Sequence, residues 1–230
     1  MTDSISFTLN GETVSAAPGE TIWQAAQRQG VDIPHLCYST QATYRPDGNC
    51  RVCMVEIEGE RTLAPSCLRK PTPDMVVTTD SDRAESARKM VMELLIADQP
   101  AQESSHDPRS ELWAWAEQMG QLTSRFPVRD APTVPVADTS HPAMAVNLDA
   151  CIHCNLCVRA CRESQVNDVI GMAYRGGAAK VVFDFDDPMA ESTCVACGEC
   201  VQACPTGALM PASLLDKSGA RTAYAESRDD

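Results

Sequence analysis

The sequence predicts an α+β fold in which two small domains are joined by a helical and proline-rich linker. A strand–turn–strand–helix pattern fills residues 5–30, and two cysteine motifs of one form lie in residues 151–205. Between them, residues 127–143 carry four prolines, a composition typical of an extended linker. We therefore expect domains at residues 1–79 and 145–212, the linker at 80–144 and a polar tail at 213–230.

Local patterns near the N-terminus predict the first domain. Ile5–Leu9 alternates apolar and polar residues, Asn10-Gly11 is a strong hairpin turn, and residues 13–15 continue as a second strand. A capping box at Thr21 and Gln24 then begins a short helix. A hairpin, a helix and then cysteines on a loop is the order expected of a β-grasp ferredoxin domain.

Four cysteines follow that helix with the spacing C-x12-C-x2-C-x13-C: Cys37, Cys50, Cys53 and Cys67. A [2Fe-2S] cluster is held by four thiolates, one pair to each iron, so this set is a candidate ligand set. The first gap is wider than the C-x4-C of plant-type ferredoxins. The spacing alone therefore leaves a zinc site open.

The linker is expected to contain two helices. Ser81 is placed to cap the first, which should end near Asp98 and bury Ala84, Ala87, Met90, Val91, Leu94 and Leu95. Residues 112–115 predict the second, in which Trp113 and Trp115 either pack locally or anchor a partner. Local packing is the favoured interpretation. Later short strands are expected at residues 146–148, 170–174, 180–185 and from 207.

The second domain carries the same cysteine motif twice: Cys151-x2-Cys154-x2-Cys157-x3-Cys161 and Cys194-x2-Cys197-x2-Cys200-x3-Cys204-Pro205. In this spacing three thiolates wrap one face of a cubane, and the fourth ligand comes from the other motif. The predicted ligands of a first [4Fe-4S] cluster are therefore Cys151, Cys154, Cys157 and Cys204, and those of a second are Cys161, Cys194, Cys197 and Cys200. An interpretation of these cysteines as disulfides or zinc sites would have to explain why two quartets of the same form occur.

The charge and the cysteine content of the chain argue against several classes of function. The chain has 19 basic and 32 acidic residues, a net charge of −13, which argues against nucleic acid or an anionic membrane surface as a partner. We expect a soluble, cytoplasmic chain, because no signal-like start and no apolar run long enough for a membrane span is present. Twelve cysteines in such a chain fit metal ligands better than disulfides. No catalytic residues are predicted, since the sequence lacks a triad motif, a P-loop and a dinucleotide fingerprint.

The sequence around these cysteines resembles a known family. The segments PHLC (residues 34–37), RPDGNCRVCMVEI (45–57) and APSC (64–67) resemble a domain shared by three proteins. These are the large iron-sulfur subunit of respiratory complex I, the diaphorase small subunit of NAD-reducing hydrogenases and the alpha subunit of NAD-dependent formate dehydrogenases. The segments HPAMAVNLDAC (141–151) and STCVACGECVQACPTGAL (192–209) look most like the formate dehydrogenase subunit.

The resemblance implies one [2Fe-2S] cluster on the first four cysteines and two [4Fe-4S] clusters on the later eight. It implies an electron-transfer module between a molybdopterin (Mo or W) catalytic domain or subunit, which oxidises formate, and a flavin/NAD-binding diaphorase subunit. The iron-sulfur diaphorase subunit of an NAD-reducing hydrogenase, or of a related complex I-like enzyme, is the alternative. A non-enzymatic zinc-binding protein is a third and disfavoured one.

Two departures from the family are expected to matter. In the complex I branch a histidine and three cysteines between the two domains hold a further cluster, but here no cysteine occurs from Leu68 to Ala150. That cluster should be missing, because His106 alone does not replace it. The formate dehydrogenase subunit also continues into a large molybdopterin domain, whereas this sequence ends at Asp230. Both a fragment and a free-standing subunit are therefore left open.

Overall fold

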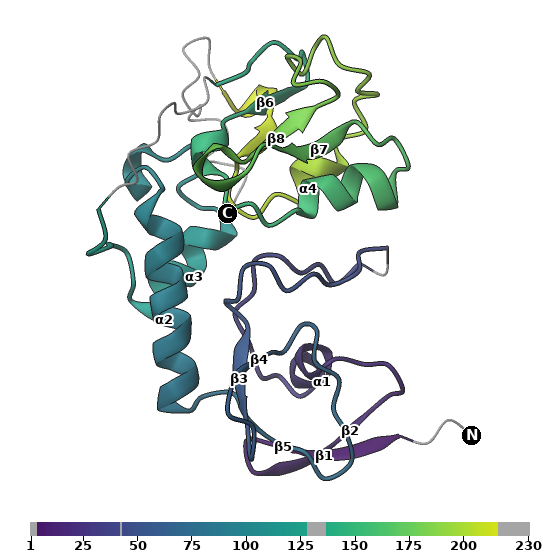
Figure 1. Ribbon diagram of the computed structural model, residues 1–230, viewed down its shortest axis with the longest axis vertical. Coiled ribbons are helices and arrows are strands. Elements are labelled where there is room, and N and C mark those ends of the chain that lie inside the picture. The colour runs from purple at the N-terminus through teal and green to yellow at the C-terminus, as the bar shows by residue number, and fades with distance from the viewer. Residues whose placement is uncertain (1–3, 42, 128–136, 216–230) are drawn as a thin grey trace.

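A five-stranded mixed sheet forms the N-terminal part of the structure, a computed structural model that describes residues 4–41, 43–127 and 137–215 (Figure 1). The strand order is β2-β1-β5-β3-β4, with β1 and β5 parallel and the other neighbours antiparallel. The strands are β1 (Ile5–Leu9), β2 (Glu12–Ala16), β3 (Met54–Ile57), β4 (Ala64–Pro65) and β5 (Val76–Thr78). Asn10 and Gly11 join β1 to β2 with φ angles of 49° and 85°, which confirms the predicted hairpin turn.

Helix α1 (Ile22–Arg28) packs on this sheet and begins with the predicted capping box. The Thr21 hydroxyl accepts from the Gln24 N–H at 3.2 Å, and Gln24 Oε1 accepts from the Thr21 N–H at 2.9 Å. Its apolar side chains, Trp23 among them, join residues of the sheet in a core of their own. The hairpin, the helix over the sheet and the cysteine-bearing loops together form the predicted β-grasp arrangement.

Helix α2 (Asp82–Ala97) begins after Ser81, whose side chain caps it as predicted, but its buried face differs from the prediction. Leu94 and Met90 are 51% and 38% exposed, although their spacing placed them on the apolar side. Arg88 is buried instead. Its guanidinium donates to the carbonyl oxygens of Met54, at 2.8 Å, and Thr79. The buried face of α2 therefore carries Arg88 beside Ala84, Met92 and Ile96, and backbone acceptors satisfy the arginine.

Helix α3 (Glu111–Met119) is the second predicted helix, and it ends at Gly120 in the left-handed conformation. Trp113 is buried, and Trp115 is partly buried against the same core. The ring of Trp115 lies 6.1 Å from that of His35, between their centroids. Both tryptophans therefore pack within the chain, which is the interpretation the sequence favoured.

Short elements build the second cysteine-rich part, at the top of Figure 1. Within residues 137–215, β6 pairs antiparallel with β9, and β7 with β8. The elements are β6 (Met144–Val146), α4 (Leu156–Arg159), β7 (Ile170–Ala173), β8 (Lys180–Phe183), α5 (Glu199–Gln202) and β9 (Leu209–Pro211). The strand predicted at residues 146–148 is misplaced. It runs from Met144 to Val146, and it does not reach Leu148 because Leu148 begins a 3-10 turn before Cys151.

Single turns of other helix types complete the described chain. The 3-10 turns are η1 (Gln102–Ser104), η2 (Leu148–Ala150), η4 (Gly176–Ala178) and η5 (Ala212–Leu214), and η3 (Ala160–Ser164) is a π-helix that continues α4. The proline-rich segment at 128–136 and the tail from 216 onward lie outside the described residues. Among the described residues, no helix is long and apolar enough to cross a membrane.

One apolar core runs through both cysteine-rich parts. It joins the loops of the N-terminal part, helices α2 and α3, and the strands and helices of the second part. Its buried members include Leu36, Tyr44, Met92, Trp113 and Leu156. The two cysteine-rich parts are thus packed against each other through shared side chains.

Candidate metal centres

The four cysteines of the N-terminal part come together in a buried cluster. Cys50 and Cys53 lie just before β3, Cys67 just after β4, and Cys37 on the loop after α1, and all four are buried. The Cys37 sulfur contacts the thiols of Cys50 and Cys67, and Cys67 also contacts Cys53. The Cys50 N–H lies 3.4 Å from the Cys37 sulfur and donates to it. The structure therefore brings together all four residues of the first predicted set.

Contacts among these four thiols lower the pKa values of two of them and raise those of the other two. Hydrogen bonds from neighbouring thiols lower the pKa of Cys37, and a hydrogen bond from Cys67 lowers the pKa of Cys53 to about 7. The contact with Cys37, together with burial, raises the pKa values of Cys50 and Cys67. Four buried thiols do not all ionise without a compensating cation, whereas iron binds and stabilises thiolates. The donor set therefore fits a thiolate-ligated cluster.

One quartet of the eight later cysteines surrounds a single pocket. Cys161, Cys194, Cys197 and Cys200 all line this small pocket, together with apolar side chains such as Val169. Cys161 belongs to the first motif and the other three to the second, so cysteines of both motifs line the same pocket. Burial, together with the charges of Cys194, Cys197 and Cys161, raises the pKa of Cys200 to about 12.

The other quartet gathers beside helix α4. Burial raises the pKa values of Cys154 and Cys157, and in both cases the nearby charges of Cys151 and Cys204 raise them further. Burial likewise raises the pKa of Cys151 to about 11. Cys204 follows α5 in the second motif, whereas Cys151, Cys154 and Cys157 belong to the first. Thiols held in this state are poised to ionise on binding a metal, because coordination stabilises the thiolate.

Both motifs fold their first turn in the same way. The N–H two residues after the first cysteine donates to that cysteine's sulfur: His153 to Cys151 and Ala196 to Cys194, each at 3.4 Å. The two donors have φ angles of 54° and 57°. Hydrogen bonds to cluster sulfurs help to set the reduction potential, and here they favour negatively charged sulfur. The repeated geometry fits two clusters of the same kind.

A single-ion site and an iron-sulfur cluster use their ligands differently. Within the described residues, no three or more His, Cys, Asp or Glu side chains are arranged to hold one metal ion. In a [2Fe-2S] cluster each iron takes two thiolates, and in a cubane held by four cysteines each iron takes one. A structural zinc ion takes four ligands at once.

Comparison with known protein families matches both cysteine-rich parts. A 2Fe-2S iron-sulfur cluster binding domain matches residues 2–82, and a 4Fe-4S dicluster domain matches residues 150–208. Both matches are iron-sulfur domains, in agreement with the cysteine geometry. The α+β fold predicted from the sequence, a 2Fe-2S domain followed by a dicluster domain, is confirmed.

Several curated proteins are similar over most of the chain. The NADP-reducing hydrogenase subunit HndD of Solidesulfovibrio fructosivorans is 36% identical, over 90% of this chain and 36% of that protein. The mitochondrial NADH dehydrogenase [ubiquinone] iron-sulfur protein 1 of Solanum tuberosum is 30% identical, over 90% of this chain and 27% of that protein. A putative formate dehydrogenase of Staphylococcus haemolyticus is 24% identical, over 96% of this chain and 22% of that protein. The chain thus spans about a third or less of the length of these relatives.

A solved structure matches over nearly its full length. A chain of NAD+-reducing [NiFe]-hydrogenase, in the H2-reduced state, superposes with a TM-score of 0.79 at 30% identity. The match covers 91% of this chain and 88% of that chain. This chain belongs to the iron-sulfur electron-transfer family of complex I-like enzymes, NAD-reducing hydrogenases and formate dehydrogenases. It is an iron-sulfur electron-transfer module.

Sequence reasoning missed how this iron-sulfur module is held together. Residues 43–49, here called the joint segment, contact the dicluster domain through five polar side chains. The contacts are Thr43–Ser164 (3.4 Å), Tyr44–Glu199 (2.8 Å), Arg45–Glu163 (2.8 Å), Asp47–Arg159 (3.2 Å) and Asn49 to the Cys154 carbonyl (3.3 Å). The wide gap between Cys37 and Cys50 was the one feature of the sequence that could have indicated this contact between the two parts. Its extra residues form the joint rather than enclosing the cluster site.

Proposed function

We propose that this module relays single electrons through one [2Fe-2S] and two [4Fe-4S] clusters. The [2Fe-2S] cluster takes Cys37, Cys50, Cys53 and Cys67, the first cubane takes Cys151, Cys154, Cys157 and Cys204, and the second takes Cys161, Cys194, Cys197 and Cys200. The observation that carries this proposal is the crossed quartet around one pocket, since three cysteines of one motif and one of the other surround the same space.

The clusters, when bound, supply one-electron exchange. The chain's own residues do the rest. Core side chains bury most of the sulfurs, and backbone N–H groups donate to the sulfurs of Cys37, Cys151, Cys161 and Cys194. The joint segment holds the two cysteine-rich parts in contact. These features fix the separation and the local charge at each cluster, which decide its potential and its exchange with the next.

The relay would connect a catalytic partner to a flavin/NAD-reducing partner, and two enzymes are candidates. Formate oxidation at a molybdopterin centre is supported by the resemblance of residues 141–151 and 192–209, and by the putative formate dehydrogenase relative. The iron-sulfur subunit of an NAD(P)-reducing hydrogenase is supported by the 36% identity to HndD and by the structural match. Their higher identity favours the hydrogenase branch.

Metal analysis of this chain on its own tests the cluster assignment, and metal analysis of the complex with its natural partners tests the choice of enzyme. The cluster assignment requires about ten irons per chain and no zinc. About eight irons would mean that the first group is not a cluster, and stoichiometric zinc would contradict the relay altogether. Molybdenum or tungsten in the complex, with clusters reduced by formate, would select the formate dehydrogenase candidate. Nickel, with clusters reduced by hydrogen, would select the hydrogenase.

A further inference from the structure

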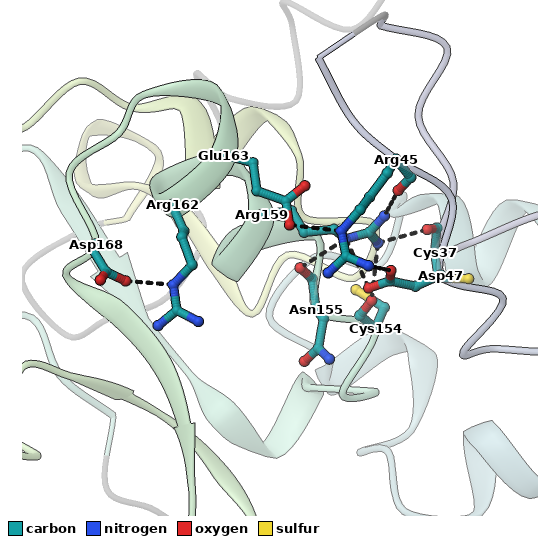
Figure 2. Close-up of polar contacts among 9 residues, drawn as sticks. All are labelled: Cys37, Arg45, Asp47, Cys154, Asn155, Arg159, Arg162, Glu163 and Asp168. Carbon is teal, nitrogen blue, oxygen red and sulfur yellow. Dashed lines mark hydrogen bonds and ion pairs between the residues drawn. The ribbon is translucent and has the colours of Figure 1, made fainter.

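One arginine lies at the joint between the two cysteine-rich parts. Arg159 is the last residue of helix α4, just after the first three cysteines of the dicluster domain, and its side chain is only 2% exposed. Figure 2 shows dashed lines from its guanidinium to Cys37, Asp47 and Cys154. A buried charge requires polar partners, and each of the three guanidinium nitrogens has at least one.

The guanidinium donates hydrogen bonds to the backbone of both candidate sites. A single nitrogen, Nη2, donates to the Cys37 carbonyl at 2.8 Å and to the Cys154 carbonyl at 3.3 Å. Nη1 donates to the carbonyl of Arg45, and Nε to that of Asn155 at 3.3 Å. One planar group thus links a candidate [2Fe-2S] ligand to a candidate ligand of the first cubane. No residue of the second quartet is among its hydrogen-bond partners.

The positive charge at this position is only partly compensated. Asp47 Oδ2 lies 3.2 Å from Arg159 Nε, but Asp47 also pairs with Arg45, whose Nη1 lies 3.1 Å from its other oxygen. Arg45 in turn pairs with Glu163 at 2.8 Å near the surface. Arg159 is the buried member of this chain of charges. Its field is therefore screened less by water than that of its exposed neighbours.

We propose that Arg159 is a positioning residue that fixes the separation of the [2Fe-2S] and first [4Fe-4S] sites and raises the reduction potential of both. The proposal rests on the proposed function, because it needs clusters at those cysteines. Reduction adds an electron to a cluster, and a nearby buried cation stabilises the added charge. The second cubane lacks this contact, so Arg159 favours electrons on the two clusters at the joint.

A purely structural joint would give a different result, and the sign of the shift separates the two. Replacing Arg159 leaves the Asp47 carboxylate beside both sites, so the local charge becomes more negative. Replacing Asp47 with asparagine leaves Arg159 in place with less compensation, so the local charge becomes more positive. If the pair acted only by holding the parts together, both changes would loosen the joint in the same way.

The experiment compares Arg159→Met, Arg159→Lys and Asp47→Asn with the wild-type holoprotein, with Arg162→Met as the matched control. Arg162 lies on the continuation of the same helix but is exposed and paired with Asp168 (Figure 2). Iron content is measured in each preparation. Redox titration followed by electron paramagnetic resonance (EPR) then gives the midpoint potential of each cluster, and pulsed EPR gives the magnetic coupling between the two clusters at the joint.

We expect Arg159→Met to lower the midpoints of the [2Fe-2S] cluster and the first cubane, and to weaken their magnetic coupling. Asp47→Asn should raise both midpoints. Arg159→Lys should keep them near wild type, because the charge is retained. The second cubane should not shift in any of these variants, and Arg162→Met should leave both midpoints at the joint unchanged.

Three outcomes would overturn the proposal: fully loaded variants with unchanged midpoints, shifts of the same sign in Arg159→Met and Asp47→Asn, or equal shifts at all three clusters. If Arg159→Met fails to hold its iron, Asp47→Asn and Arg159→Lys still decide the question. A wild-type protein without clusters would instead contradict the proposed function, and the iron measurement separates that failure from this one.

Discussion

The Tyr44 hydroxyl donates to Glu199 Oε1 at 2.8 Å, between residues 155 positions apart in the sequence. Tyr44 is 6% exposed and belongs to the joint segment, while Glu199 lies between Cys197 and Cys200 in the second cysteine motif. Burial, reinforced by the neighbouring carboxylate, raises the pKa of Tyr44, so the phenol stays a neutral donor. The loop that starts at Cys37, a candidate [2Fe-2S] ligand, thus also contacts the motif that carries three candidate ligands of the second cubane.

Replacing Tyr44 with phenylalanine should weaken this joint without changing the size of the side chain much. The Glu199 carboxylate would lose its donor, which we expect to reduce the free energy of unfolding by about 1.5 kcal/mol. The midpoint of thermal unfolding, followed by circular dichroism at fixed iron content, measures the change.

Tyr174→Phe is the matched control for that variant. The Tyr174 hydroxyl also donates to a carboxylate, Asp186 Oδ2 at 2.9 Å, but the residue is 66% exposed. Water replaces an exposed hydrogen bond, so this change should cost little. Equal effects of the two variants would show that the buried contact at the joint has no special role.

The crossed ligand sets predict which variants resemble each other. Cys204→Ala should give the same cluster spectrum as Cys154→Ala, because the proposed assignment gives both thiols to the first cubane although they belong to different motifs. Cys161→Ala should likewise match Cys197→Ala. EPR spectra of the reduced proteins, with iron content, make the comparison. If Cys204→Ala matched Cys197→Ala instead, each motif would hold its own cluster and the crossed assignment would be wrong.

Gly207 holds the turn after Cys204 against the segment before α3. A Cβ added at Gly207 would lie 2.4 Å from the Asp107 Cβ, and its φ of 71° is strained for other residues. Nearby, the Leu112 N–H donates to the Pro205 carbonyl at 3.1 Å. Gly207→Ala should therefore reduce the free energy of unfolding by about 1–3 kcal/mol. It should also release the first cubane before the second, because Cys204 lies three residues away.

Gly177→Ala provides the comparison for this prediction. No atom lies within 4 Å of a Cβ added there, and its backbone is not in the left-handed region. The substitution should leave both the thermal midpoint and the order of cluster loss unchanged. The thermal midpoint of each variant is read from visible absorbance of the clusters during heating. The order in which the two cubanes are lost is read from EPR spectra of the reduced samples. Simultaneous loss of the two cubanes in Gly207→Ala would contradict the local role of this turn.

The sequence was informative where the structure depends on neighbours in the chain. The Thr21–Gln24 capping box, the Asn10-Gly11 turn and the first turn of each cysteine motif encode their geometry within a few residues. The buried arginines do not. Arg88 bonds to a carbonyl 34 positions away, and Arg159 to one 122 positions away. Since every residue offers a carbonyl, no pattern of side chains marks these acceptors, and a count of hydrophobic spacing misassigns the face that carries the arginine.

Two helix N-caps in this chain allow a final prediction in which one change costs stability and its counterpart does not. At α1 the Thr21 side chain accepts from the Gln24 N–H, whereas at α3 the buried Ser110 hydroxyl has no hydrogen-bond partner in the described structure. Thr21→Ala should reduce the free energy of unfolding by about 1 kcal/mol. Ser110→Ala should be neutral or stabilising, because it removes an unsatisfied buried polar group. Denaturant unfolding of the two variants at equal iron content measures the difference. A loss at Ser110→Ala as large as that at Thr21→Ala would mean that the serine hydroxyl makes a capping bond in solution after all.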